Sequence, residues 1–351
     1  MKKYKVIGIM SGTSMDGVDI AYCEFWQIDQ HWKFEIKHAE TIAYNNTWIV
    51  RLSALHKQPI HLLPKTDAYY GKYLGQLVNN FIKKYSLQVD FIASHGHTIF
   101  HQPQNGFTTQ IGCGANLYAE TGIKTINNFR VVDVAFGGQG APLVPIGDEL
   151  LFNQHDACLN LGGFSNISFT INQSRKAFDI GPCNIVTNQV AQQLGFDFDD
   201  GGKLANQGKV NAILLKELNN LPYYKINPPK SLGIEWVNTV FWPTVNSYQI
   251  TGIDLLATFE QHIAIQIAET INANKLTHVL VTGGGAFNTS LINQINKLTK
   301  QALTIPDELL VNYKEALIFA FLGILRVEGN VNALKSVTGA TQNNMGGAIW
   351  G

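Results

Sequence analysis

Apolar residues in the first hundred positions come in short runs, which are separated by a glycine-rich turn and followed by a helical repeat. The turn, 11–17, lies between two runs rich in β-branched and aromatic residues, a pattern that predicts strand, turn, strand. Apolar residues at Tyr69, Tyr73, Leu77 and Phe81 have the spacing of one helix face. The elements predicted here are strands at 5–10, 18–25 and 34–44, a helix at 65–85 and a strand at 91–94.

The same order begins again near residue 157, although the two halves share almost no sequence identity. An apolar run again ends in a glycine turn, at Gly162 and Gly163, and a second β-prone run follows it. The predicted elements are strands at 157–161, 167–171 and 177–180, helices at 184–194 and 255–273, and a strand at 278–282. We interpret this as a structural duplication in which each half is a mixed sheet flanked by helices. The loop-forming run 137–142 predicts domains at 1–140 and 141–351, with the return of the C-terminal segment to the first domain left open.

Composition excludes several classes of protein. Hydrophobic residues make up 45% of the 351 positions and charged residues 15%, which is typical of a packed globular chain. The 26 basic residues balance the 26 acidic ones, and no block of like charge offers a surface for nucleic acid or an anionic membrane. The four cysteines are far apart, and no stretch reads as a signal peptide or a membrane span. We therefore expect a cytoplasmic protein with a small-molecule partner.

The turn 11–17 carries the clearest chemical signal of the sequence. Gly12 and Gly17 would let the main chain approach an anion closely, and Thr13 and Ser14 add hydroxyl donors. Asp16 could hold a hydrated Mg²⁺, which takes only one or two carboxylates beside the phosphates of its nucleotide. The alternative is an ordinary glycine-containing turn with a solvated Asp16.

Two further glycine turns change the balance between these readings. The pair Gly162 and Gly163, and the run 283–285, each directly follow a predicted buried strand, which favours a nucleotide site. Neither a P-loop nor a complete Gly-x-Gly-x-x-Gly fingerprint occurs. The repeated order therefore indicates an α/β fold of two actin-like (ribonuclease H-like) domains with ATP between them, by analogy with actin, sugar kinases and 70-kilodalton heat-shock proteins.

Several short motifs are spread along the sequence. They are IMSGTSMDGVD at 9–19, SHGHT at 94–98, GGQGAPLVP at 137–145, NLGGFSN at 160–166, DIGPCN at 179–184, Lys230-Ser231 with Glu235, TGGG at 282–285, EAL at 315–317 and SVTGA at 336–340. In these motifs and in their order, the sequence resembles the anhydro-N-acetylmuramic acid kinase family, and the similarity extends over essentially the whole chain.

This resemblance implies a bacterial cytosolic enzyme of peptidoglycan recycling. Such kinases use ATP, Mg²⁺ and water to open the 1,6-anhydro bridge of anhydro-N-acetylmuramic acid and to phosphorylate the freed O6. The resemblance assigns Asp179 as general base. It also assigns the residues that would bind ATP, namely Gly12, Thr13, Ser14, Met15, Asp16, Gly17, Val18, Asp19, Gly162, Gly163, Gly283, Gly284 and Gly285.

The chemistry of water attack is consistent with the assignment of Asp179. A water that attacks an anomeric carbon needs a carboxylate within hydrogen-bond reach to take its proton. Asp179 ends a predicted strand, and Gly181-Pro182 turns the chain after it. The alternative is that Asp179 caps the helix that starts near Asn184.

Four more residues are expected at the sugar: His95, Arg130, Asp133 and Glu315. The guanidinium of Arg130 could bind a lactyl carboxylate or an N-acetyl oxygen, and the alternative is a surface arginine beside a loop aspartate. Glu315 either contacts a sugar hydroxyl or only favours the dipole at a helix start. A metal site at His95, His97 and His101 would need a ligand from elsewhere in the chain.

One residue departs from the family pattern, since Cys183 stands where relatives usually carry a second glycine. A positive φ at that position would be strained with cysteine, so the loop is expected to differ slightly. The rival functions are a conventional hexose or amino-sugar kinase and an ATP-gated binding protein of the same fold. Whether the protein forms a homodimer is left open.

Overall fold

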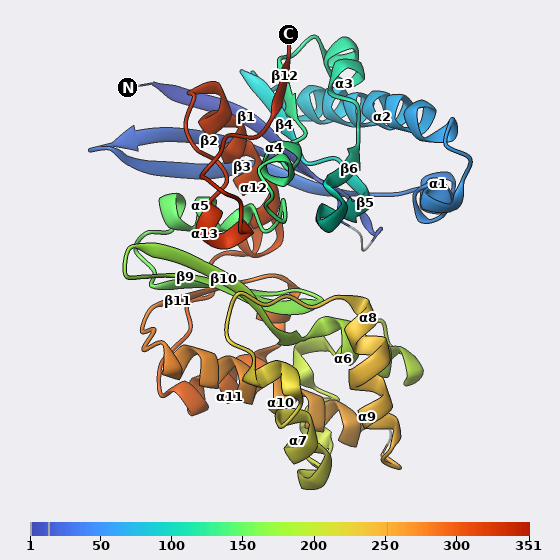
Figure 1. The fold of residues 1–351 in the computed structure, drawn as a ribbon, viewed down its shortest axis with the longest axis vertical. Coiled ribbons are helices and arrows are strands. Elements are labelled where there is room, and N and C mark those ends of the chain that lie inside the picture. The colour runs from blue at the N-terminus through green and yellow to red at the C-terminus, as the bar shows by residue number, and fades with distance from the viewer. Residues whose placement is uncertain (1, 13–14, 251) are drawn as a thin grey trace. The chain divides into compact units, whose positions relative to one another are not determined.

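The computed structural model describes residues 2–12, 15–250 and 252–351, which form two compact units (Figure 1). The first unit contains residues 1–151 and 313–351, and the second contains residues 152–312. The first unit therefore extends beyond residue 140, because the helix α5 (Val144–Leu151) packs against the strand β3 and, through Gly147, against Ile318. The C-terminal segment does rejoin the first unit, which the sequence had left open.

The first unit is built on a six-stranded sheet with the order β12-β7-β4-β1-β2-β3. β1, β2 and β3 pair antiparallel, and β4 lies parallel to β1. Each of the four strands and the helix predicted in the first half is present. The strands are β1 (Lys3–Met10), β2 (Gly17–Ile28), β3 (His31–Ala43), β4 (Phe91–Ser94), β7 (Thr125–Asn127) and β12 (Ala348–Trp350).

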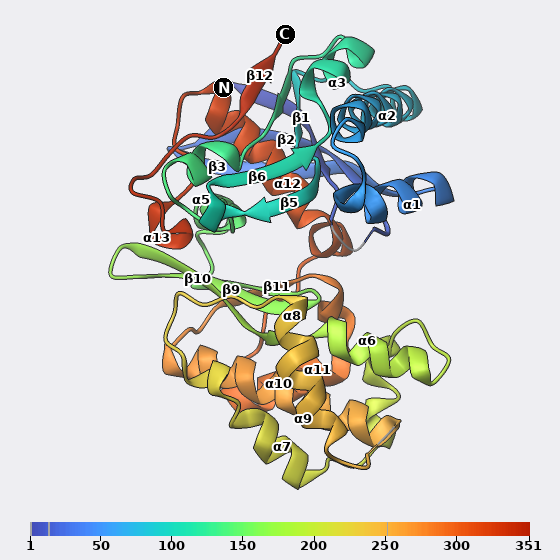
Figure 2. The same ribbon diagram turned by 45° about the vertical axis from the view of Figure 1, so that its right-hand side comes forward.

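Strand periodicity explains how this sheet is covered on both faces. Ile7 and Ile9 of β1 belong to a core cluster with α2 (Leu62–Tyr85) and α3 (Gly114–Thr121), whereas Gly8 between them meets the backbone of α12 at Ala316. Figure 2 shows α2 and α3 side by side in this unit. The smaller elements are α1 (Asn46–Ala54), α4 (Val131–Ala135), α13 (Lys335–Thr338) and a hairpin of β5 (His97–Gln102) and β6 (Phe107–Ile111).

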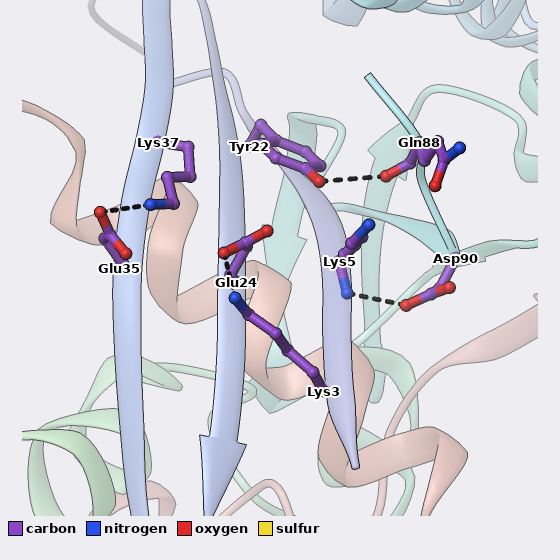
Figure 3. A network of polar contacts seen from close by, with 8 residues as sticks. All are labelled: Lys3, Lys5, Tyr22, Glu24, Glu35, Lys37, Gln88 and Asp90. Carbon is purple, nitrogen blue, oxygen red and sulfur yellow. Dashed lines mark hydrogen bonds and ion pairs between the residues drawn. The ribbon is translucent and has the colours of Figure 1, made fainter. Parts of the chain in front are cut away.

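Polar contacts fix the start of β4 and the outer strands of this sheet (Figure 3). Lys5 donates its backbone N–H to Asp90 Oδ2 at 2.7 Å, and the backbone N–H of Asp90 donates to the carbonyl of Lys5 at 2.8 Å. Tyr22 donates its hydroxyl to the carbonyl of Gln88 at 3.1 Å. The same view shows two ion pairs, Lys3–Glu24 between β1 and β2 and Glu35–Lys37 within β3. Surface ion pairs add little stability, whereas the hydrogen bonds of Asp90 and Gln88 hold the segment before β4 beside β1 and β2.

The second unit repeats this arrangement in a smaller sheet. Its order is β10-β9-β8-β11, with antiparallel pairs β8–β9 and β9–β10 and a parallel pair β8–β11, so it matches β3-β2-β1-β4 strand for strand. The structural duplication predicted from the sequence is confirmed. The strands are β8 (Ala157–Leu161), β9 (Phe164–Ile171), β10 (Ser174–Pro182) and β11 (Val279–Thr282).

Two long helices cover the sheet of the second unit. Apolar residues of α10 and α11 pack with those of β8, β9 and β11 in one buried cluster, and Figure 1 shows both helices along one side of the strands. The helices are α6 (Asn184–Gln193), α7 (Ala212–Asn219), α8 (Ile234–Trp236), α9 (Trp242–Asn246), α10 (Ile253–Ala273) and α11 (Thr289–Thr299). In the described residues, none of the helices is long and apolar enough to cross a membrane.

The helix α12 (Glu308–Val327) has a kink near its start. Tyr313 lies within it at φ −116° and ψ 15°, which are not helical values, so the helix has a kink at the boundary between the two units. Glu315 therefore lies in the first turn after the kink, in the first unit.

Candidate active site

In the second unit, two glycine turns and the start of α6 come together. Asn184 donates its side-chain amide to the carbonyl of Leu161 at 3.0 Å, at the end of β8. A Cβ added at Gly284 would lie 3.7 Å from the Asn184 amide nitrogen, and one added at Gly285 would lie 2.7 Å from Leu161 Cβ. The turn between β8 and β9 and the turn after β11 are thus neighbours, as expected for the ends of adjacent parallel strands.

The glycines of these turns fall into two groups. Gly283 has a φ of +83°, and an added Cβ would lie 2.5 Å from Asn160 Oδ1, so the packing of the unit itself requires glycine there. Gly162 and Gly163 have no positive φ, and an added Cβ would meet its nearest atom at 3.3 Å and 3.7 Å. Their carbonyls accept from the first amides of α6, while among the described residues no partner accepts from their own N–H groups. Backbone N–H groups that have no partner and no side chain beside them allow an anion to approach closely.

Substitution at Gly163 tests this reading of the turn. We expect Gly163→Val to fold normally, because its side chain has space, and to raise the dissociation constant for ATP at least tenfold, about 1.4 kcal/mol, by keeping phosphate away from the main chain. Isothermal titration calorimetry measures the constant, and Ser174→Val at the other end of the β9–β10 hairpin is the control. Unchanged ATP binding in Gly163→Val would remove this turn from the phosphate site.

Asp179 lies at a bulge of β10, where the register shifts between Asp179 and Gly181. Its Oδ2 accepts the backbone N–H of Leu232 at 2.8 Å, and its own main chain is held by the carbonyl of Lys230 and the hydroxyl of Tyr223. Burial raises the pKa of Asp179, and the hydrogen bond from Leu232 opposes this shift. No described residue donates to Oδ1, and Asp179 is not the N-cap of α6, a position held by Cys183. The geometry is that of an oriented carboxylate with one oxygen open.

The positive φ that would strain a cysteine does not occur at Cys183. Its φ is −132°, so the position does not require glycine in this structure. Its side chain is 1% exposed, and burial raises the pKa of the thiol to about 12. A thiol that stays protonated and buried has no role in the chemistry.

In the first unit, the structure brings Arg130 and His95 into direct contact. Arg130 donates its Nε–H to His95 Nε2 at 2.9 Å and an Nη1–H to the carbonyl of Gly140 at 2.7 Å. Burial lowers the pKa of Arg130 to about 10, with Glu315 and Asp133 opposing the shift, so the guanidinium remains charged at neutral pH. Its Nη2 group has no partner among the described residues and is available to a ligand.

His95 and Asp133 differ from Arg130 in that their polar atoms are already engaged. The second ring nitrogen of His95, Nδ1, bonds to the carbonyl of Gly96 at 2.8 Å. Asp133 is 0% exposed; its Oδ2 accepts the N–H of Gly140, and its Oδ1 accepts from Thr338 and Asn344. The direct sugar contact expected of Asp133 is therefore incompatible with its burial, and neither ring nitrogen of His95 is left for a sugar.

Glu315 is accessible to solvent, yet the surrounding protein removes enough water to raise its pKa. The positive charge of Arg130 opposes this shift, although no ion pair joins the two side chains in the described structure. Because Glu315 and Arg130 form no ion pair with each other, both side chains remain available to a ligand.

The turn that follows β1 is described only in part, because Thr13 and Ser14 lie outside the described residues. Met15 has a φ of +58°, Gly12 accepts weakly from its N–H, and Val18 is buried. An added Cβ at Gly17 would lie 2.5 Å from the carbonyl oxygen of Ile42, so packing against β3 already requires glycine there.

Two carboxylates lie at the end of this turn and at the start of β2, namely Asp16 and Asp19. Asp16 Oδ1 accepts the N–H of Gly17, and Asp19 Oδ1 accepts the hydroxyl of Thr41 at 2.7 Å. Burial and the nearby charge of Asp16 raise the pKa of Asp19. Two carboxylates close enough to interact suit a hydrated Mg²⁺, which needs few protein ligands.

The histidines His95, His97 and His101 are not part of a cluster of metal ligands in the described structure. No group of three or more metal-ligating side chains occurs in residues 2–12, 15–250 and 252–351. Burial lowers the pKa of His97 to about 4, so its ring is neutral. His101 bonds through Nδ1 to the hydroxyl of Thr108.

Comparison with known proteins found a matching family model, named relatives and solved structures. Residues 4–351 match the model of a family described as anhydro-N-acetylmuramic acid kinase. A protein of that name from Hydrogenovibrio crunogenus is 33% identical over 368 residues, covering 98% of this chain and 97% of the relative. One from Coxiella burnetii is 34% identical over 372 residues, covering 100% and 99%. Among solved structures, a ROK family glucokinase from Streptomyces griseus in complex with glucose and AMPPNP has a TM-score of 0.41 at 10% identity, covering 91% and 98%.

Proposed function

The chain belongs to the anhydro-N-acetylmuramic acid kinase family, and we propose that it opens the 1,6-anhydro ring of anhydro-N-acetylmuramic acid while phosphorylating O6 with ATP. The product is N-acetylmuramic acid 6-phosphate, formed during peptidoglycan recycling in the cytoplasm. The match over residues 4–351, with 33% identity to a relative over nearly its full length, carries this proposal.

Asp179 acts as the general base in this proposal. Water attacks the anomeric carbon C1, the bond from C1 to O6 breaks, and the proton of the water passes to Asp179. The N–H of Leu232 holds Oδ2, which leaves Oδ1 to accept that proton, and the raised pKa brings the carboxylate nearer to the basicity that proton transfer requires.

Arg130 and Glu315 bind the sugar. The free Nη2 of Arg130 suits the lactyl carboxylate, because a guanidinium forms strong charge-assisted hydrogen bonds with a carboxylate. Glu315 accepts a hydrogen bond from a sugar hydroxyl. His95 and Asp133 act through other residues: His95 orients Arg130 directly, and Asp133 holds the N–H of Gly140, whose carbonyl binds Arg130.

ATP supplies the phosphoryl group, and Mg²⁺ neutralises charge on its phosphates. The amides of Gly162 and Gly163 would hold phosphate oxygens, with the turn of Gly283, Gly284 and Gly285 beside adenosine. The turn from Gly12 to Asp19 would contact the remaining phosphates, and Asp16 would hold the hydrated metal ion.

A substrate panel tests the proposal. We expect ATP-dependent phosphorylation of anhydro-N-acetylmuramic acid at least a hundredfold faster than that of N-acetylglucosamine or glucose, followed by release of ADP. Preference for glucose or N-acetylglucosamine would instead support a conventional sugar kinase, and ATP binding without turnover of any sugar would support a binding protein.

A further inference from the structure

The carbonyl oxygen of Gly96 is the meeting point of two hydrogen-bond chains in the first unit. The hydroxyl of Ser11 donates to it at 2.9 Å, and Nδ1 of His95 bonds to it at 2.8 Å. A carbonyl oxygen has two lone pairs and only accepts, so both partners must donate and its capacity is filled.

The donor and the acceptor of every hydrogen bond in the first series, which leads to Gly96 through Ser11, follow from this. The hydroxyl of Ser11 donates its only proton to the carbonyl of Gly96. Its oxygen must therefore accept the hydrogen bond from the hydroxyl of Tyr70, at 2.9 Å. Because the hydroxyl of Tyr70 donates its proton to Ser11, it must accept the hydrogen bond from the hydroxyl of Tyr44. The order is therefore Tyr44 to Tyr70 to Ser11 to Gly96, with no alternative arrangement.

The second chain has an equally fixed direction. Because His95 Nδ1 donates to Gly96, its Nε2 must be the acceptor in a neutral ring, and Arg130 can only donate. Burial first and the charge of Arg130 second hold the pKa of His95 well below its usual range, so the ring stays neutral. The carbonyl of Gly96 and the donor of Arg130 therefore require the same tautomer of His95, which is protonated at Nδ1.

Only glycine can present its carbonyl in this way at position 96. Its φ is +76°, and an added Cβ would lie 2.4 Å from the carbonyl oxygen of Ile111 on the neighbouring strand β6. This gives a physical reason for glycine within the motif 94–98. The residues that lead to Gly96 in the first series of hydrogen bonds are also buried, since Tyr70 is 0% exposed and Ser11 is 2% exposed. Their hydroxyl groups therefore have little access to water.

We infer that Tyr70 and Ser11 are positioning residues, which hold the carbonyl of Gly96 so that His95 keeps the tautomer that orients Arg130. This inference rests on the proposed function only in making Arg130 a sugar ligand. It links the end of β1, beside the turn 11–17, to the guanidinium that would bind the sugar.

The variant Tyr70→Phe tests the inference, because it removes one oxygen and keeps the ring. The Tyr70 hydroxyl makes two buried hydrogen bonds, with Ser11 and Tyr44, and both are lost. We expect the resulting displacement of Arg130 to raise the KM for the anhydro sugar roughly fivefold to tenfold. The dissociation constant for ATP should stay within about twofold of the parent value, since the displaced group is Arg130. The matched control is Tyr73→Phe on the same helix, whose ring lies 6.1 Å from that of Tyr70 and whose hydroxyl has no partner among the described residues.

A second measurement does not depend on turnover. In nuclear magnetic resonance of ¹⁵N-labelled protein, the Nε–H of Arg130 should exchange slowly with water in the parent and in Tyr73→Phe. It should exchange at least several times faster in Tyr70→Phe and in Ser11→Ala, which interrupts the same chain next to Gly96.

The outcomes separate the inference from the proposed function. Unchanged exchange of Arg130 in both Tyr70→Phe and Ser11→Ala overturns the inference, and so does a loss of ATP affinity with sugar KM unchanged. If the parent does not phosphorylate the anhydro sugar but Arg130 still exchanges faster in both variants, the proposed function fails and the positioning of Arg130 stands.

Discussion

Asp179→Asn is expected to lower turnover of the anhydro sugar by about 10² to 10⁴, the range for loss of a general base, while ATP binding stays nearly unchanged. Asparagine has almost the same shape, and its Oδ1 can still accept the N–H of Leu232 that orients Asp179. What it cannot do is take a proton from water. Steady-state kinetics on the purified variant and calorimetry with ATP measure the two effects, and turnover equal to the parent would exclude Asp179 as the base.

Asp179→Asn is expected to lower turnover without lowering the free energy of unfolding. This combination distinguishes a catalytic residue from one that the fold requires. Burial raises the pKa of Asp179, so the folded state disfavours the charged form. Asp179 contributes stability at pH values below the pKa that it has in the unfolded chain. This contribution is lost as the pH rises through the higher pKa that it has in the folded protein. At pH 7 the charged, partly buried carboxylate therefore costs stability, and asparagine removes this cost.

Urea unfolding should accordingly show Asp179→Asn to be at least as stable as the parent at pH 7, with the difference shrinking at pH 3. Asp197→Asn, in an exposed loop, is the matched control and should change neither turnover nor stability. A variant of Asp179 that is both inactive and much less stable would show that the residue supports the fold.

The sequence predicted the core strands of both units because their signal is local. Short apolar runs bounded by glycine turns correspond to β1, β2, β8 and β9, and the repeated order identified the duplication. The hairpin of β5 and β6 was missed, since polar residues interrupt both of its strands. The domain boundary was placed too early because the packing of α5 depends on contacts with distant β3, which periodicity cannot reveal.

The candidate site shows the same division between local and distant information. Glycine turns and Asp179 stand out in the sequence because their neighbours along the chain are informative. The burial of Asp133 depends on Thr338 and Asn344, which lie some two hundred residues away. Tyr70 carried no signal of its own, since an aromatic residue on the apolar face of α2 is first explained by packing, and its hydrogen bond to Ser11 exists only in three dimensions.

Ring opening of the anhydro sugar should not occur at all without ATP, and this dependence separates the proposed mechanism from that of a glycosidase. Breaking the bond from C1 to O6 leaves negative charge on O6, which a two-carboxylate glycosidase neutralises with a protonated acid. Of the motif-matched carboxylates, Asp179 is assigned as base, Glu315 as a sugar ligand, and Asp16 and Asp19 to the ATP site. Glu235 has no assigned role, so none of them is assigned to protonate O6. The γ-phosphoryl group would neutralise O6 in place of an acid.

Reaction in ¹⁸O-labelled water with ATP is therefore expected to place one label on C1 of the product and none in the new phosphate. The attacking water supplies the oxygen on C1, while the oxygen that joins sugar to phosphorus is the original O6 of the substrate. Mass spectrometry of the product and of its fragment without phosphate locates the label. Incubation with ADP in place of ATP is the control, because ADP occupies the nucleotide site without offering a γ-phosphoryl group. Label in the phosphate, or ring opening with ADP alone, would mean that hydrolysis and phosphorylation are separate events, and Asp179 would then need a second acid to protonate O6.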